Sequence, residues 1–328
     1  MRVSRLATLV LTALACAGAS AAGLRSLTIP ATANAPAIQA LAWTPCAAKP
    51  RALDIGDFVL QAARDCAVAG NALPLVVISH GQGGSMLGHN DTALALANAG
   101  FVVVSLNHPG DWYGDDAAAQ ELRIFESRPR DVSRAISYML EQWPDRNRLA
   151  PDAIGVFGFS RGGYTALALA GAVPSLPASD ARFCSPWWSF VLPLCRELGN
   201  GGSLRLGADP RVRAAVVVDP LNLFDAAGLA QVRIPVQLWA SELGGDGVQL
   251  THVEAVRVSA PGVREYRVAR GAGHFAYLAP CPASWRDSAE KLCKDPDGFD
   301  RVRWHQLMNA EVVRFFTQHL RPPGPSTT

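Results

Sequence analysis

Short runs of hydrophobic residues alternate along the chain with segments in which hydrophobic residues recur at helical spacing. Runs without polar alternation are typical of strands in a parallel sheet that is covered on both faces. The pattern predicts strands at 24–30, 40–43, 73–79, 101–106, 154–159, 213–219, 234–239 and 264–268, and helices at 91–99, 129–143, 164–171, 253–258 and 307–320. Strands that alternate with helices predict an α/β fold with a mostly parallel central sheet, helices on both faces and right-handed crossovers.

Three segments break this rhythm. Residues 46–70 have no clear pattern, and we interpret them as an irregular stretch. Residues 173–209 also lack a period, and an insertion of this length inside a compact α/β domain favours a functional cap over a plain connection. Residues 321–328 are rich in proline and predict a mobile tail. We therefore expect one domain over residues 23–320, with a cap insertion at about 173–209.

Ser160 follows an apolar run and precedes an alanine-rich helical pattern, within the pentapeptide Gly158-Phe159-Ser160-Arg161-Gly162. This is the G-x-S-x-G pattern of a nucleophile elbow, in which a strand turns sharply into a helix and exposes a strained serine. Glycines on both sides avoid Cβ atoms that would collide with the strand and the helix. The pentapeptide alone is a weak match, but its place between a strand and a helix predicts that Ser160 is a nucleophile.

His274 is the base that the sequence favours for Ser160, because a serine hydroxyl attacks only when a base takes its proton. It follows the last predicted strand in a glycine-rich loop, from which an imidazole can reach back over the sheet. The alternative is a loop histidine with a structural hydrogen bond. The other histidines either precede the serine or lie on or beside predicted helices: His80, His89, His108, His252, His305 and His319.

Asp219 is the favoured acid, because it ends a predicted strand directly before Pro220 and so lies at the carboxyl edge of the sheet. Glu242 and Asp246 follow the next strand and are the alternatives. A further alternative makes Asp219 only the cap of a turn or helix.

An oxyanion formed at the ester carbonyl needs two backbone N–H donors. Arg161, the residue after the nucleophile, supplies one in the elbow arrangement. We expect the other from Gln82, in the glycine-rich loop 80–84 that follows the strand 73–79. The alternative is that this loop is only a tight turn. Its glycines do not have the G-x-G-x-x-G spacing of a dinucleotide site.

Aromatic residues are the candidates for a substrate pocket: Trp112, Tyr113, Trp187, Trp188 and Phe190. They are expected to line an apolar acyl or aromatic pocket, and aromatic packing beneath a cap is the equal alternative. The histidines show no H-E-x-x-H and the cysteines no C-x-x-C spacing, so we expect no metal and no other cofactor.

In their order these motifs resemble the α/β-hydrolase superfamily, and within it the bacterial predicted dienelactone hydrolases, which are similar to platelet-activating factor acetylhydrolases. The matching segments are 76–83, 158–163, 217–220, 271–275 and 297–301. In the acetylhydrolase branch the acid follows the strand after the elbow helix, which the resemblance carries over to Asp219. True dienelactone hydrolases have a cysteine nucleophile, and this chain has Ser160 in its place, so dienelactone specificity is not implied.

Residues 1–22 have the features of a secretory signal peptide. Arg2 and Arg5 precede an apolar core, and the small residues around Ala21 and Ala22 offer a cleavage site. The apolar core is too short to span a membrane. Lipidation at Cys16 is the alternative. We expect the mature protein to be periplasmic or secreted.

The cysteines agree with export. The chain has seven, and those other than Cys16 form pairs that are close in sequence: Cys46 with Cys66, Cys184 with Cys195, and Cys281 with Cys293. In an oxidising compartment such pairs predict disulfides, with this connectivity resting on proximity alone. Buried thiols are the alternative.

Charge limits the partners. The chain has 30 basic and 28 acidic residues, and without Arg2 and Arg5 the two numbers are equal. No basic block indicates a nucleic acid partner, and the sequence does not indicate an oligomeric state.

From these motifs together we predict a serine carboxylic-ester hydrolase that forms an acyl-enzyme on small-molecule esters. A lipase-like or polyester hydrolase, acting on lipid or polymeric esters, is the alternative, with a peptidase less favoured. Another class of protein, a catalytically silent binding module on a hydrolase fold, is the third possibility.

Overall fold

The computed structural model describes residues 21–175, 193–199, 204 and 206–321. Its strands are β1 (Ala21–Ile29), β2 (Ile38–Cys46), β3 (Arg51–Ile55), β4 (Phe58–Arg64), β5 (Leu73–Ser79), β6 (Val102–Leu106), β7 (Leu149–Phe159), β8 (Val212–Val218), β9 (Val236–Ser241) and β10 (Val263–Ala269). Its helices are α1 (Asn90–Asn98), α2 (Ile124–Glu141), α3 (Arg161–Leu169), α4 (Pro193–Gly199), α5 (Ala226–Leu229), α6 (Leu250–Ser259), α7 (Trp285–Ser288), α8 (Glu290–Cys293) and α9 (Arg301–Leu320), with short 3₁₀ turns η1 (Arg146–Arg148) and η2 (His274–Tyr277).

The strands form one sheet of ten in the order β10-β9-β8-β7-β5-β6-β2-β1-β4-β3. From β10 to β6 all neighbours are parallel, whereas β2 is antiparallel to both β6 and β1. In the parallel part, the strands β5, β6 and β9 are buried along their whole length. This explains their unbroken hydrophobic runs, and the predicted mostly parallel sheet is confirmed.

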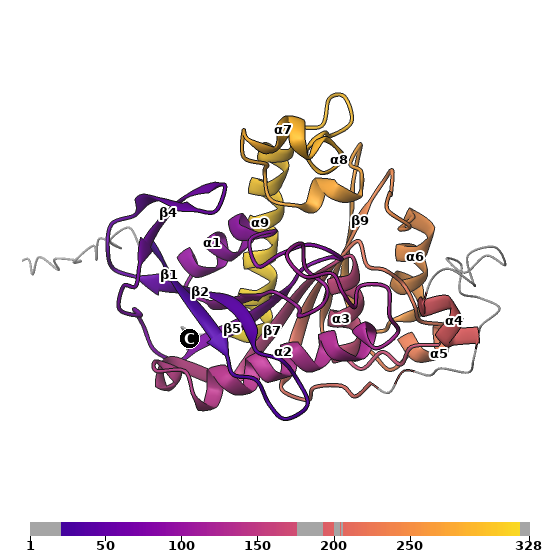
Figure 1. Ribbon diagram of the computed structural model, residues 1–328, viewed down its shortest axis with the longest axis horizontal. Helices are drawn as coiled ribbons and strands as arrows, with labels where there is room; N and C mark the ends of the chain where they lie inside the picture. Colours follow the sequence, from indigo (N-terminus) through magenta and orange to yellow (C-terminus); the bar gives the residue numbers. More distant parts are fainter. Residues whose placement is uncertain (1–20, 176–192, 200–203, 205, 322–328) are drawn as a thin grey trace, which may run out of the picture.

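Helices cover both faces of the sheet, as the sequence predicted (Figure 1). On one face α2, α3 and α6 pack through residues such as Ile136, Leu167 and Val253 against Val77 and its neighbours in the central strands. On the other face α1 and α9 pack against the sheet and each other. The sheet is thus held between two hydrophobic layers, which fixes the positions of its strand ends.

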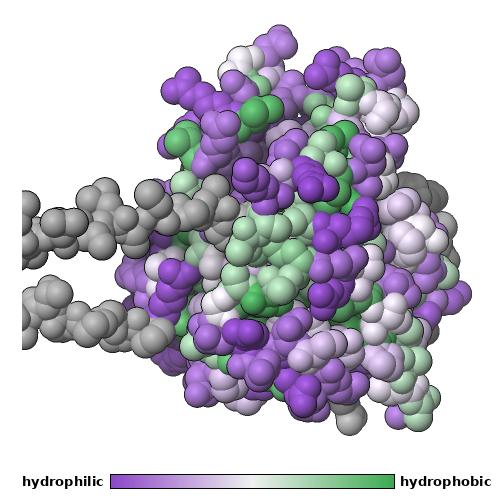
Figure 2. Space-filling view, turned by 90° about the vertical axis from the view of Figure 1, so that its left-hand side faces the viewer, coloured by the Kyte–Doolittle hydropathy of each residue, from purple (hydrophilic) through white to green (hydrophobic). Residues whose placement is uncertain are grey.

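The interpretation of residues 46–70 as irregular is wrong. This stretch forms the hairpin β3–β4, in which Ile55 pairs with Phe58 across a tight turn that includes Gly56 at φ +58°. The strands are short and alternate, so that Phe58 and Leu60 are buried while their neighbours face outward. Alternation over so few residues is a weaker sequence signal for a strand than the unbroken apolar runs of the central strands. The end of the molecule that carries these strands shows a hydrophobic area with hydrophilic borders (Figure 2).

Several helices begin earlier than predicted, and the difference is largest for α2 and α9. Helix α2 begins at Ile124 rather than at Pro129, because the buried Ile124 and Phe125 extend its hydrophobic face. Helix α9 begins at Arg301, where the Asp300 side chain accepts a hydrogen bond from Arg303 N and caps the first turn. The earlier start of α2 places Arg128, which is fully buried, inside the helix.

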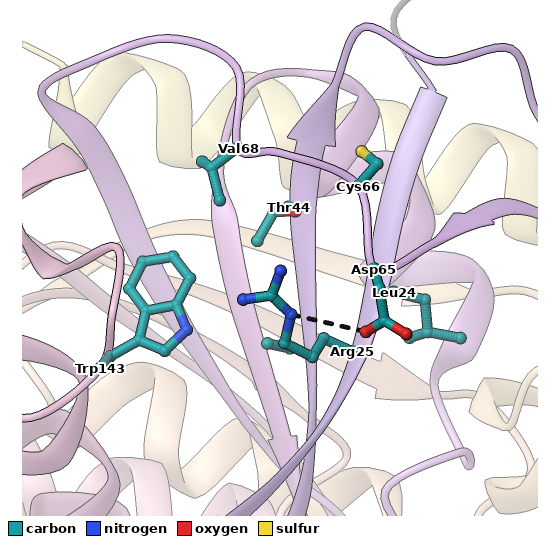
Figure 3. A pocket seen from close by; sticks show the side chains of 8 residues that line it. Leu24, Arg25, Thr44, Asp65, Cys66, Val68 and Trp143 are labelled. Carbon is teal, nitrogen blue, oxygen red and sulfur yellow. Dashed lines mark ion pairs between the residues drawn. The ribbon is translucent and has the colours of Figure 1, made fainter.

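The N-terminal strands are joined to one another by a disulfide and an ion pair, and to the segment after α2 by a second ion pair. Arg25 of β1 lies 3.5 Å from Asp65 (Nε to Oδ1), and Arg25 Nη1 lies 3.4 Å from Asp145 Oδ2. Figure 3 shows the Arg25–Asp65 pair beside Cys66, which forms a disulfide with Cys46 of β2. This end of the fold is therefore cross-linked as well as packed.

Two of the predicted disulfides are present, Cys46–Cys66 and Cys281–Cys293, and they are compatible with an oxidising compartment. Cys184 of the third predicted pair lies outside the described residues. No helix in the described part of the chain is long and apolar enough to cross a membrane.

Several other predictions also fall outside the described residues, namely most of the signal peptide with Cys16, most of the cap insertion with Trp187, Trp188 and Phe190, and the tail from residue 322. Ala21 and Ala22, near the expected cleavage site, pair with Cys46 and Pro45 at the start of β1. Within the insertion, the structure shows the short helix α4.

Candidate active site

The carboxyl ends of the parallel strands gather the predicted functional residues at one edge of the sheet. Ser160 directly follows β7, and Asp219 directly follows β8. The loop that begins at His80 follows β5, and His274 lies in the turn η2 after β10. Because β5, β7, β8, β9 and β10 are successive neighbours, residues far apart in the sequence meet at this edge.

Ser160 has the strained backbone that a nucleophile elbow requires. Its φ is +56° and its ψ is −117°, a combination that L-residues rarely adopt. A Cβ atom on Gly158 would overlap the carbonyl of Gly162, and one on Gly162 would overlap the carbonyl of Ser79. The strand, the helix and the neighbouring loop therefore approach too closely for side chains at these two positions. The turn leaves Ser160 8% exposed, in contrast to the second half of the strand before it, where Val156 and Phe157 are fully buried.

His274 is held by Asp219 through a short hydrogen bond. His274 Nδ1 lies 2.6 Å from Asp219 Oδ2. The same carboxylate accepts hydrogen bonds from Ser241 N at 2.9 Å and from Ser241 Oγ at 2.6 Å, so its orientation is fixed. His274 Nε2 is buried and has no hydrogen-bond partner in the described structure. When Nδ1 donates to the carboxylate, Nε2 of the neutral ring is free to accept a proton.

The alternative acids occupy other positions. Glu242 accepts hydrogen bonds from Gly271 N at 2.8 Å and from Arg270 Nη1 at 2.6 Å. The Gly271 N–H, followed by Arg270, holds the pKa of this carboxyl below its usual value. Asp246 pairs with Lys291 at the surface. Of the three candidate acids, Asp219 is thus the one that is hydrogen-bonded to the His274 imidazole.

The loop after β5 packs directly against the elbow. A Cβ atom on Gly81 would lie 3.2 Å from Ser160 Cβ and 3.2 Å from the ring of Phe159. The side chains of the two predicted donor residues also meet, because Gln82 Oε1 accepts a hydrogen bond of 2.5 Å from Arg161 Nη2. Gln82 and Arg161 therefore lie together beside Ser160.

Behind this loop lies a buried cluster of charged residues that the sequence did not indicate. Asp111 Oδ2 accepts hydrogen bonds from Arg161 Nη1 at 2.8 Å and from Arg128 Nη1 at 2.7 Å. Arg128 also donates to the carbonyl of His80 at the start of the loop. The position of Asp111, in the loop after a predicted strand, was the only sequence signal for this cluster.

Two buried histidines adjoin the cluster, and both are neutral near pH 7. Burial, followed by the charge of Arg128, lowers the pKa of His80 and of His108 well below the usual value. His108 Nε2 lies 2.9 Å from Ser79 Oγ, and His108 Nδ1 lies 3.1 Å from Asp131 Oδ2.

The predicted aromatic pair lies beside the loop 80–84 that follows β5. Tyr113 N donates to Gly84 O at 3.0 Å, and the rings of Trp112 and Tyr113 meet edge to face with their centroids 5.0 Å apart. Trp112 is half-buried, whereas Tyr113 is 75% exposed. The part of the chain that the structure describes contains no cluster of three His, Cys, Asp or Glu side chains that could hold a metal ion.

Comparisons with known proteins show the fold. No protein-family model matches the sequence, and no curated protein matches it. Among solved structures the chain is similar to a ferulic acid esterase from Streptomyces cinnamoneus, with a TM-score of 0.63 and 18% sequence identity over 96% of this chain and 94% of that one. The chain has an α/β-hydrolase fold.

In the α/β-hydrolase fold the carboxyl edge of the sheet carries the nucleophile elbow, and this chain has its strained serine there. The resemblance to the dienelactone hydrolase and platelet-activating factor acetylhydrolase group remains a prediction at this level of identity.

Proposed function

We propose that the protein is a serine carboxylic-ester hydrolase with Ser160 as nucleophile, His274 as general base and Asp219 as the acid that orients the imidazole. The observation that carries this proposal is the state of His274. One ring nitrogen is held by Asp219, while the other is without a hydrogen-bond partner at the sheet edge where the strained Ser160 lies. This is the arrangement that a base needs in order to take a proton from a serine hydroxyl.

Hydrolysis proceeds in two steps through an acyl-enzyme. Ser160 Oγ attacks the ester carbonyl carbon as His274 Nε2 takes its proton, and the tetrahedral intermediate collapses when the imidazolium gives that proton to the leaving alkoxide. A water molecule then attacks the acyl-enzyme as His274 takes its proton, and the bond to Ser160 Oγ breaks as the imidazolium returns that proton to Oγ, which releases the acid product. Asp219 keeps the ring in the tautomer with a free Nε2 and stabilises the imidazolium that forms in each step.

The negative oxygen of each intermediate is stabilised by the backbone N–H groups of Gln82 and Arg161. Two observations support this assignment: Gly81 packs on Ser160, and the side chains of Gln82 and Arg161 are hydrogen-bonded to each other. Donors that are already in place before the reaction stabilise the transition state without reorganisation.

Esters of aromatic acids are the substrate class to test first. The pair Trp112–Tyr113 places an exposed aromatic surface beside residues 80–84, the proposed oxyanion loop. The similar solved structure is named as a ferulic acid esterase. Aromatic side chains bind flat acyl groups by stacking and by burial of apolar area. Lipid and polymeric esters are the other classes to compare, and the two disulfides support action outside the cytoplasm.

The test is a hydrolysis profile of the purified protein on p-nitrophenyl esters of increasing acyl length, on methyl ferulate, and on an emulsified triglyceride and a polyester film. We expect turnover of the soluble esters, with methyl ferulate preferred over aliphatic methyl esters. Ser160→Ala serves as the matched control and should remove this turnover. No turnover of any ester by a folded wild-type protein would instead support a binding module on the hydrolase fold.

A further inference from the structure

We propose that the Arg161 side chain, held by Asp111, is a positioning element of the oxyanion hole that links its two donor residues and places a buried positive charge beside them. The inference rests on the proposed ester hydrolysis and extends it from the backbone of Arg161 to its guanidinium.

The guanidinium spans the gap between the two halves of the hole. Arg161 provides its own backbone N–H at the start of α3, while its Nη2 reaches the Oε1 of Gln82 on the loop after β5. Its Nη1 donates to Asp111 Oδ2 and to Ala119 O, each at 2.8 Å, and its Cζ lies over the Phe125 ring, 5.0 Å from the centroid. Arg161 is only 5% exposed, so these contacts hold its side chain in one position within the protein.

Asp111 connects this contact to the rest of the loop. Its Oδ2 accepts from both Arg161 and Arg128, and its Oδ1 lies 3.4 Å from Gly83 N. Arg128 in turn donates to the carbonyl of His80. Asp111 and the two arginines therefore fix the oxyanion loop at its beginning, at Gln82 and at Gly83.

The balance of charge in this cluster is positive. Two guanidinium groups share one carboxylate, and burial lowers the pKa of Arg128 only to about 10, so it remains charged near pH 7. The adjoining His80 and His108 are neutral there. Burial raises the pKa of Asp131, the next carboxyl, to about 7, so it offsets only part of the excess. A fixed positive charge that is itself buried stabilises the oxyanion more than the ester, which has no net charge.

A double-mutant cycle between Gln82 and Arg161 tests the link. Gln82→Ala removes the Oε1 acceptor and leaves the backbone N–H, and we expect a fall in kcat of roughly 10-fold with KM changed less than about 2-fold. Arg161→Gln removes both the link and the charge and should lower kcat by about 100-fold. The double variant should be no slower than Arg161→Gln alone, because the two residues act through one contact.

Arg161→Lys separates charge from geometry. It keeps the positive charge but lacks the planar fork that reaches Asp111 and Gln82 together, so its kcat should return to about the level of Gln82→Ala. Arg130→Gln is the matched control. Arg130 lies on α2, is exposed and pairs with Glu126, so the same loss of charge there should leave kcat within about 2-fold.

The outcomes separate this inference from the proposed function. Wild-type turnover with full additivity in the cycle, or with an effect on KM alone, would overturn the link while the esterase remains. A wild type that neither turns over esters nor reacts with a fluorophosphonate would overturn both. Gln82 is exposed, so if Arg161→Gln does not fold, an unchanged kcat in folded Gln82→Ala still refutes the proposal.

Discussion

Two Ser–His–Asp sets lie in the part of the chain that the structure describes, and they differ in how the serine is presented. The elbow set consists of Ser160, His274 and Asp219. The buried set consists of Ser79, His108 and Asp131. In the buried set both hydrogen bonds are formed, at 2.9 Å from Ser79 Oγ to His108 Nε2 and at 3.1 Å from His108 Nδ1 to Asp131 Oδ2. In the elbow set the His–Asp bond is shorter, at 2.6 Å, and the histidine's Nε2 has no described partner.

The two serines differ in backbone and in access. Ser79 ends a regular strand, is fully buried, and lies 3.4 Å from Arg128 Nη2. No substrate carbonyl reaches a hydroxyl in that position. Ser160 has a φ of +56° in the turn at the sheet edge and is 8% exposed, whereas Ser79 has no exposed surface. Hydrogen bonds among three side chains therefore do not distinguish the two sets, whereas the strained turn that carries Ser160 does.

A third histidine, His305, is also paired with an aspartate but lacks an open ring nitrogen. His305 Nδ1 lies 2.6 Å from Asp91 Oδ2, the same distance as in the elbow set, but His305 Nε2 lies 2.9 Å from the carbonyl oxygen of Ala276. Both nitrogens of this ring therefore lie against protein oxygen atoms, and neither is open to a substrate. His305 joins α1 and α9 to the turn η2 that carries His274.

The largest expected difference between the sets lies in their serines. Ser160→Ala should lower kcat by about 10⁵-fold or more, because it removes the nucleophile. Ser79→Ala should leave the kcat of the folded protein within about 5-fold, with a loss of about 1–3 kcal/mol in the free energy of unfolding, because it leaves buried partners unpaired. Ester hydrolysis and urea unfolding of both variants measure these effects. A collapse of kcat in folded Ser79→Ala would reverse the assignment.

The second largest expected difference in kcat lies between variants of the acids. Asp219→Asn should lower kcat by about 10⁴-fold, because the imidazole loses the partner that sets its tautomer. Asp131→Asn and Glu242→Gln should each stay within about 5-fold of the wild type, since neither carboxyl touches His274. Steady-state kinetics of the three variants decide this, and the assignment of Asp219 fails if Glu242→Gln is the slow one.

A smaller effect concerns the protonation of Asp131. This carboxyl has an ordinary pKa of 3.8, which burial raises to about 7 in the folded protein. Between these values the folded protein keeps a proton that the unfolded chain has lost, so the contribution of Asp131 to stability falls as the pH rises through this window. Relative to Asp131→Asn, the wild type should lose up to about 4 kcal/mol between pH 4 and pH 7 and change little above it. Urea unfolding of both proteins across this range is the measurement. A difference that does not vary with pH would show that Asp131 is ionised when folded.

Local patterns in the sequence predicted the central sheet and the elbow. Fully buried strands have unbroken hydrophobic runs, and the close approach at Gly158 and Gly162 leaves a glycine signature. The sequence could not predict contacts between distant segments. Asp111 and Arg128 became a cluster only when α2 packed beneath the loop after β6, and the start of that helix was itself predicted five residues too late. The choice among the acids also depended on packing, because three carboxyls follow neighbouring strands.

The most direct test of the central claim is to label the wild-type protein with a fluorophosphonate and to locate the modified serine by peptide mass spectrometry. We predict one adduct, on Ser160, formed in parallel with the loss of ester hydrolysis and absent from Ser160→Ala. An adduct on Ser79, or full loss of hydrolysis without modification of Ser160, would contradict this account.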